Sequence, residues 1–178
     1  KGALMKSYQK VPSQLLLMKN KEPRKPIDVS TEPFKKALGE TSKALADSKN
    51  LEVSFSSEKS AFKDGNAILP PISRKMTLNE ILVARGTADS HALRNRYSND
   101  RIYNQYLPKG ELDAKIYESM EAARCEAIGT TDMPGTASNI NSRIINDATK
   151  NGYDNSVSDF GSFLPEAIGL YVKEIFTK

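Results

Sequence analysis

The sequence predicts a mainly α-helical domain that carries one small antiparallel β-hairpin. Apolar residues recur at three- and four-residue intervals in five separate stretches, which is the spacing of one helix face. Strict alternation of apolar and polar residues is confined to one short region. Strands and helices do not alternate along the chain as they do in parallel doubly wound sheets. We therefore expect about five longer helices and a single hairpin.

Length and composition are those of one globular domain. The chain has 178 residues, of which 38% are hydrophobic and 27% are charged, a balance that suits a folded protein. No apolar run approaches the ~20 residues of a membrane span and no signal peptide is evident, so we expect a cytoplasmic protein. The single Cys125 cannot form an internal disulfide, and we expect it to be structural.

Positive charge is concentrated at the N-terminus. Residues 1–30 contain seven basic and two acidic residues, whereas the rest of the chain contains nineteen basic and twenty acidic residues. Because Pro23 and Pro26 favour extended backbone, we expect residues 1–30 to form a basic tail or linker and residues 31–178 to form the helical domain. The sequence opens with KGALM and no initiator methionine, so we expect its first residues to be foreign to the natural protein.

The first helix of the domain is expected to run from Thr31 to about Ser48. Ser30 or Thr31 can cap it, and Pro33 falls in its first turn, where the missing N–H costs nothing. Its apolar face is predicted to consist of Phe34, Ala37, Leu38, Thr41 and Leu45.

The hairpin is expected directly after this helix. Leu51, Val53 and Phe55 alternate with polar residues, and a polar loop follows. We expect this strand to pair antiparallel with a strand around Ile68, which is ended by two prolines.

A second helix is expected to begin at Thr77, because Thr77 and Glu80 match a capping box. Positions 78, 82, 85, 89 and 93 then share one face, which puts Arg85 among leucines. A buried Arg requires carboxylate partners, so we expect Arg85 to pair with Asp89 or Glu126 at the centre of the domain. The alternative is that Arg85 belongs to a contact surface for another subunit.

Three longer helices complete the expected domain, with a short helical turn before them in IYNQYLP. The first is closed by Gly129 and its stripe is Leu112, Ile116, Met120, Ala123 and Ala127. The second ends at Asn151-Gly152 and its stripe is Ala137, Ile140, Ile144 and Ala148. The third carries Pro165 in its first turn and its stripe is Leu164, Ile168, Tyr171, Val172 and Ile175.

The segment DNSVS, which starts at Asp154, has the Asp-x-Ser-x-Ser order of a metal-ion-dependent adhesion site. Such a site requires a preceding buried strand and later ligands, and the sequence offers neither. Turn and helix-capping roles for Asp154 and its neighbours are therefore favoured over a cation site.

Other catalytic or metal chemistry finds little support. His91 is the only histidine and lacks a second soft ligand nearby, so a partly buried or surface helix position is favoured over a zinc site or a catalytic triad. The chain contains no P-loop, and we expect no ATP hydrolysis by this chain alone.

Several segments resemble a known family in order and spacing: EPFKKAL, LEVSFSSEK, ILPP, RKMTLNEILVARGTADSHALR, AKIYESMEAARCEAIG and LPEAIGLYVKEIF. The chain resembles the N-terminal domain of CobT from about Glu32 to its end. The most specific pieces contain six residues, which we take as structural or interface candidates: Arg85, Gly86, Asp89, Glu121, Arg124 and Glu126. We expect no catalytic, cofactor-binding or metal-binding residue in this chain.

The resemblance implies a subunit of the aerobic cobaltochelatase of cobalamin biosynthesis. CobT acts with the AAA-type ATPase CobS and the large subunit CobN, and the complex uses ATP, magnesium and cobalt to insert cobalt into hydrogenobyrinic acid a,c-diamide. The family's metal-ion-dependent adhesion site lies in a C-terminal von Willebrand A-type domain that these 178 residues do not include. Protein–protein assembly is the implied role, and a ring of identical subunits is compatible with it.

Two other functions stay open from the residues alone. A helical nucleic-acid-binding module would use the basic residues 1–30, although it should carry its Lys and Arg on one folded face. An independent metal-binding or hydrolytic domain would need ligands converging on Asp154 or His91. We expect neither nucleic acid nor membrane as a partner.

Overall fold

The computed structural model describes residues 26–57, 60–63, 65–151 and 160–177. The helices within these residues are α3 (Thr31–Ala46), α4 (Leu78–Tyr97), α5 (Asp100–Tyr106), α6 (Glu111–Asp132), α7 (Gly135–Lys150) and α8 (Phe160–Phe176). The strands are β1 (Ile27–Asp28), β2 (Glu52–Phe55), β3 (Ala61–Lys63), β4 (Asn66–Leu69) and β5 (Lys75–Met76). Five longer helices and one short helix confirm the mainly α-helical fold class.

The strands pair differently from the predicted hairpin. The antiparallel hairpin consists of β3 and β4, and Gly65 turns between them with a φ of 75°. The segment predicted to pair antiparallel with the strand around Ile68 is β2, and it instead lies parallel to β4. The hairpin partner β3 pairs with one edge of β4, so β2 lies on the other edge, in the strand order β2-β4-β3. The chain passes through β3 between β2 and β4, so β2 and β4 are not joined by a direct turn and can run in the same direction.

The folded body begins before Thr31, where the sequence placed its start. Strand β1 pairs antiparallel with β5, and the N–H of Val29 donates to the Arg74 carbonyl at 2.7 Å. Val29 is buried in a cluster with Met76 and Ala84. Residues 27–29 are therefore attached to the domain, while the rest of the expected tail, residues 1–25, lies outside the described residues.

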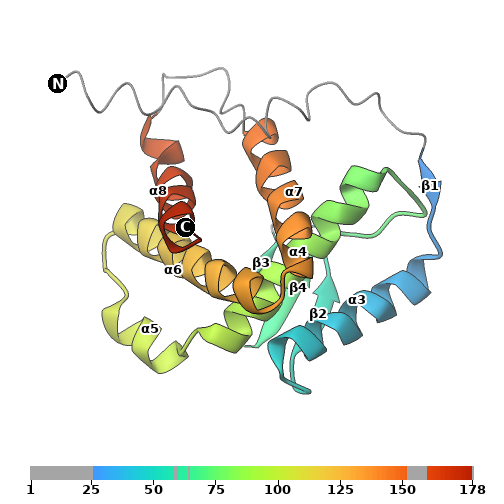
Figure 1. Cartoon of the computed structure of the whole chain (residues 1–178), viewed down its shortest axis with the longest axis horizontal. Helices are drawn as coiled ribbons and strands as arrows, with labels where there is room; N and C mark the ends of the chain where they lie inside the picture. The colour runs from blue at the N-terminus through green and yellow to red at the C-terminus, as the bar shows by residue number, and fades with distance from the viewer. Residues whose placement is uncertain (1–25, 58–59, 64, 152–159, 178) are drawn as a thin grey trace.

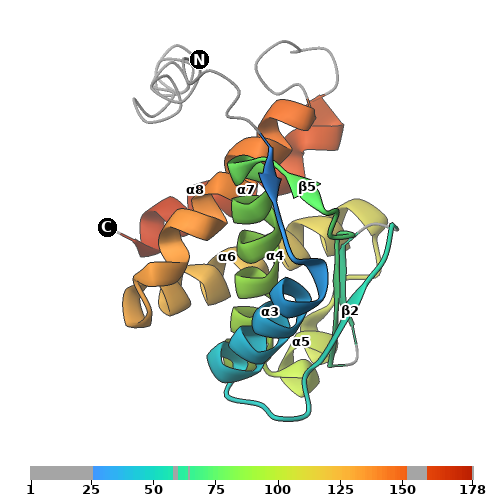
Figure 2. The same ribbon diagram turned by 90° about the vertical axis from the view of Figure 1, so that its right-hand side faces the viewer.

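Helix α4 lies in the middle of the molecule, with α3 and the strands on one side and α6 and α7 on the other (Figures 1 and 2). It starts as predicted, because Thr77 and Glu80 form the capping box in both directions. Small side chains let neighbours approach it on several sides, and the buried ones include Ala84, Ala88 and Ala92. The core is consequently split into small clusters around α4.

Glycines mark two of the closest helix crossings. A Cβ on Gly86 of α4 would lie 2.2 Å from the Asn139 carbonyl oxygen of α7. A Cβ on Gly129 of α6 would lie 2.3 Å from a methyl carbon of Leu93 of α4. Gly129 was predicted to close its helix, but α6 continues to Asp132, and this glycine lies instead at the crossing with α4.

Several predicted apolar faces are rotated from the observed ones. On α3, Ala37 and Thr41 are exposed, and the buried face runs instead through Leu38, Ser42 and Ala46. On α8, Tyr171 and Ile175 face outward, and this helix begins at Phe160, so Pro165 lies inside it and not in its first turn. Apolar residues on more than one side of a helix make its inward face ambiguous in sequence.

Candidate functional site

A buried carboxylate connects four helices at the centre of the molecule. Glu126 of α6 is 3% exposed. Its Oε1 accepts hydrogen bonds from Ser90 Oγ of α4 at 2.6 Å and from Arg143 Nη2 of α7 at 2.7 Å. Its Oε2 accepts one from Lys173 Nζ of α8 at 3.0 Å. We call these four residues the Glu126 cluster.

The Glu126 cluster keeps its acid ionised. Burial by itself would raise the pKa of Glu126, but the charges of Arg143 and Lys173 lower it below the ordinary glutamate value. Arg143 also lies 3.5 Å from Asp147, one turn further along α7. The two cations, Arg143 and Lys173, are therefore matched by the carboxylates of Glu126 and Asp147, so the charges largely cancel.

A cavity of about 140 Å³ lies against this cluster, between α6, α7 and α8. Its lining is Ser119, Ala122, Ala123, Glu126, Arg143, Ile144, Asp147, Ala148, Glu166, Gly169, Leu170 and Lys173. Helix α7 packs mainly on α4, and helix α8 packs mainly on α6. The cavity lies in the space left between α7 and α8.

A second polar group joins the C-terminal end of α4 to the middle of α6. Glu121 binds Arg124 through two short contacts, Nε to Oε2 at 2.7 Å and Nη2 to Oε1 at 2.8 Å. Arg124 Nη2 also donates to the carbonyl oxygen of Tyr97 at 2.7 Å, and Ser98 Oγ donates to Glu121 at 2.8 Å. Burial raises the pKa of Glu121, but the hydrogen bonds and charge of Arg124 bring it below the ordinary value.

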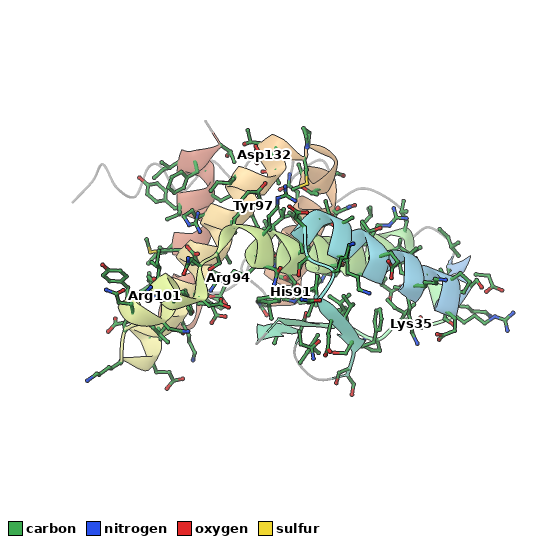
Figure 3. The ribbon with its side chains drawn as sticks, turned by 90° about the horizontal axis from the view of Figure 1, so that it is seen from below. Lys35, His91, Arg94, Tyr97, Arg101 and Asp132 are labelled. Atoms are coloured by element: carbon green, nitrogen blue, oxygen red, sulfur yellow. The ribbon has the colours of Figure 1, made fainter. Side chains whose placement is uncertain are left out.

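Aromatic residues extend this group toward α5. The guanidinium of Arg94 lies 4.3 Å from the centre of the Tyr103 ring, which stacks on Tyr117 at 5.1 Å. Figure 3 shows Arg94 on the α5 side of α4, and Tyr97 close to Asp132, whose Oδ2 accepts a hydrogen bond from the tyrosine hydroxyl at 2.7 Å. The contacts of Tyr103 with Arg94 and Tyr117 join α5, which buries none of its own residues, to α4 and α6.

The comparison with protein-family models identifies the family of this chain. A family model described as "Cobalamin biosynthesis protein CobT" matches residues 28–178. The chain belongs to the CobT family. The match covers the whole described body apart from its first two residues, and it confirms the resemblance inferred from the sequence motifs. A place in cobalamin biosynthesis follows from that membership. No solved structure matches this CobT chain.

The family motif that contains Arg85, Gly86 and Asp89 does not form the predicted centre of the domain. Arg85 is exposed, and its guanidinium lies 6.0 Å from the Phe34 ring, so the expectation of a buried Arg85 ion pair is wrong. Asp89 is 4% exposed and accepts a hydrogen bond from Asn139 Nδ2 at 2.8 Å. Gly86 does admit a second helix, as predicted, but that helix brings an amide and Arg143 rather than a carboxylate.

The residues of the other family motif, Glu121, Arg124 and Glu126, are divided between the two polar groups. Glu121 and Arg124 belong to the group that joins the end of α4 to the middle of α6, whereas Glu126 belongs to the Glu126 cluster. Cys125 between them is fully buried, and burial raises the pKa of its thiol to about 11. A thiol with that pKa stays protonated at neutral pH, in agreement with the structural role predicted for it.

The sequence analysis missed both cations of the Glu126 cluster. Arg143 follows the buried Ile140 by three positions, so helical spacing alone could have placed it on the inward face of α7. Lys173 is the only basic residue of α8 and follows the buried Gly169 by four positions, so helical spacing could also have placed it toward the inward side of α8. Neither signal identifies Glu126 as the partner.

His91 is partly buried on α4, as predicted. Its Nε2 lies 3.1 Å from Ser60 Oγ, whose proton is directed to the Ile68 carbonyl, so Nε2 is the donor. Burial and the charge of nearby Arg143 together lower the pKa of His91 to about 4, against the opposing charge of Glu126. Figure 3 shows this histidine on the side of α4 that faces the strands.

Asp154 and the rest of DNSVS lie outside the described residues. Within the described ranges, no group of three or more His, Cys, Asp or Glu side chains is placed to hold a metal ion. Of the helices that the structure describes, none combines the length and the apolar character needed to cross a membrane.

Proposed function

We propose that this chain is an assembly domain of an ATP-dependent cobaltochelatase. Its partners are an AAA-type ATPase subunit and a large chelatase subunit, and the complex inserts cobalt into hydrogenobyrinic acid a,c-diamide. In this proposal the chain supplies no catalytic group. Membership of the CobT family supports the pathway, and an exposed apolar helix face supports the role in assembly.

The outward face of α8 is the observation that carries the proposal. Four large apolar residues of this helix are 41% to 66% exposed: Leu170, Tyr171, Ile175 and Phe176. Leu170, Tyr171 and Ile175 lie on one side of the helix, because Tyr171 follows Leu170 directly and Ile175 follows Tyr171 by four positions, about one turn. We call Leu170, Tyr171 and Ile175 the α8 face.

The opposite side of α8 is already used. Pro165 and Gly169 are buried, and a Cβ on Gly169 would lie 3.1 Å from the Ser119 carbonyl oxygen of α6. Lys173 reaches from α8 to Glu126. A helix that is apolar on both sides is typical of one that is covered on both sides, so the α8 face fits a protein partner.

Binding measurements with purified subunits test this role. The double variant Tyr171→Glu with Ile175→Glu should weaken binding to the ATPase subunit or to the large subunit by about tenfold or more, because two buried contacts would become charged. Both side chains are more than half exposed, so the melting temperature should not fall. Ala37→Glu, at an exposed position of α3, is the matched control and should bind as the unchanged chain does.

Two outcomes would contradict the proposal. One is unchanged binding of the double variant to both subunits, measured separately. The other is that the unchanged chain binds neither subunit while light scattering shows that it remains a monomer. Self-association that the double variant abolishes would assign the α8 face to contacts within a ring of identical subunits, which is also an assembly role.

A further inference from the structure

The outer edge of β2 carries unpaired backbone groups. The N–H of Glu52 donates to the carbonyl of Gly65, just before β4, at 3.1 Å. The N–H of Ser56 donates to the carbonyl of Leu69 in β4 at 3.0 Å. Backbone groups alternate in direction along a strand, so the N–H and C=O groups of Val53 and Phe55 point away from β4. Since the sheet order is β2-β4-β3, no described strand lies on that side.

An open groove of about 940 Å³ runs along this edge, between β2 and α3. On the helix side the groove is lined by Gly39, which has no side chain, and a Cβ there would make ordinary contact with Val53 Cβ at 4.0 Å. At one end the ammonium group of Lys35 lies 5.6 Å from the centre of the Phe55 ring. Figure 2 shows β2 beside α3 at the surface of the molecule, and Figure 3 shows Lys35 on the side of α3 that faces the strands.

The groove has a small excess of positive charge. Its charged lining residues are Glu32, Lys35, Lys36, Glu40, Lys43, Lys49 and Glu52. Glu32 and Glu40 lie 3.0 and 3.4 Å from lysines on the same helix. Those two acids are thus matched within α3, and Lys36 and Lys49 outnumber the remaining Glu52.

We propose that this groove binds an extended, acidic peptide segment of a protein partner, which adds a strand to the outer edge of β2. A strand is the one regular structure that can satisfy the backbone groups of Val53 and Phe55 together. Alternate side chains of that strand would lie in the groove beside Gly39, and acidic side chains would meet Lys36 and Lys49. This site is separate from the α8 face and does not depend on it.

The test uses a defined peptide and the whole chain. The probe is the blocked hexapeptide Glu-Val-Glu-Val-Glu-Val, titrated at pH 7 while the backbone amides are followed by NMR. We expect the Val53 and Phe55 amides to shift and to gain protection from hydrogen exchange. The same peptide with lysine in place of each glutamate should bind about tenfold more weakly, because the groove is basic.

A pair of leucine variants separates groove binding from stability. Gly39→Leu fills the space opposite Val53 and should weaken peptide binding by about tenfold or more, without lowering the melting temperature, since leucine favours a helix more than glycine does. Ala37→Leu makes the same kind of change on the exposed side of α3 and should leave binding unchanged. The pair Lys36→Glu with Lys49→Glu should reverse the preference between the two peptides.

Three results would overturn the inference. The first is the absence of shifts at Val53 and Phe55 with either peptide at millimolar concentration. The second is equal binding to the Gly39→Leu and Ala37→Leu variants. The third is a free protein that is dimeric with these amides already protected, because a second copy would then occupy the edge of β2.

Discussion

Glu126 retains its charge inside the protein because protein groups replace the water that it loses. Isolated burial of a carboxylate is unfavourable by several kcal/mol, whereas Ser90, Arg143 and Lys173 together supply one hydroxyl and two cations at 2.6 to 3.0 Å. The three donors come from three different helices. A single acid on α6 thereby fixes the relative positions of α4, α7 and α8.

The first residue-scale prediction concerns removal of that charge. Glu126→Gln should lower the free energy of unfolding at pH 7 by about 3 to 5 kcal/mol, because Lys173 would lose its carboxylate partner and Arg143 would keep only the half-exposed Asp147. Urea denaturation measures this loss. Glu111→Gln is the control, since its ion pair with Lys115 is exposed, and it should cause no measurable change. Equal effects of the two substitutions would contradict a central role for Glu126.

The second concerns Asp89, whose burial raises its pKa from 3.8 to about 6, even though Asn139 and Arg85 favour the charged form. Between these two values the folded state holds a proton that the unfolded state releases, so this group makes the protein less stable as pH rises from about 4 to 6. Asp89→Asn removes the effect. The variant should be more stable than the unchanged chain at pH 7, by on the order of 2 kcal/mol, and equally stable near pH 3.

Denaturant titrations at both pH values check the Asp89 prediction. His91 contributes to the pH dependence of stability with the opposite sign, because burial lowers its pKa to about 4. Stability from His91 is present above pH 6.5 and is lost as pH falls toward 4. A less stable Asp89→Asn variant at pH 7 would show that the ionised carboxylate is required.

At the scale of elements, glycine decides how closely α4 and α7 can pack. The Asn139 carbonyl oxygen occupies the place where a Cβ on Gly86 would stand, at 2.2 Å, and backbone atoms cannot move aside as a flexible side chain can. The buried hydrogen bond between Asp89 and Asn139 depends on this approach. The close packing of α4 on α7 thus explains the glycine of the Arg85-Gly86 pair. It does not explain the arginine, which is exposed.

Gly86→Ala should therefore destabilise the domain although alanine favours a helix. We expect a loss of about 1 to 3 kcal/mol in the free energy of unfolding, because the added methyl group forces α4 and α7 apart. Gly39→Ala on α3 is the matched control, with 4.0 Å of room, and should stabilise by about 0.5 to 1 kcal/mol. Thermal and urea denaturation of the two variants should show opposite signs. Stabilisation by Gly86→Ala would contradict the close crossing.

For the whole molecule, the arrangement around α4 predicts how stability is distributed. Ala88, Ala92 and Leu93 of α4 are 0% or 1% exposed and contact different neighbours, whereas α5 buries none of its residues. Backbone amides of α4 should exchange with solvent only through global unfolding, and amides of α5 should exchange faster through local opening. Native-state hydrogen exchange measures both. Equal protection of α4 and α5 would contradict this division.

The sequence was sufficient for the local features of this protein. The capping box at Thr77 and Glu80, the helix start at Thr31 and the number of longer helices were all predictable, because periodicity, caps and turns act within a few residues of chain. The family motifs were equally readable, since they are short and ordered. These features determined a mainly α-helical CobT domain.

Only the tertiary structure decided which groups meet. The exposure of Arg85, the parallel pairing of β2 with β4 and the joining of Glu126 to Lys173 involve contacts between segments far apart in sequence. Apolar residues on two sides of α8 gave no local sign of which side faces inward. Burial and ion pairing depend on the positions of several helices at once, and helical periodicity records the spacing along one helix without naming its neighbour.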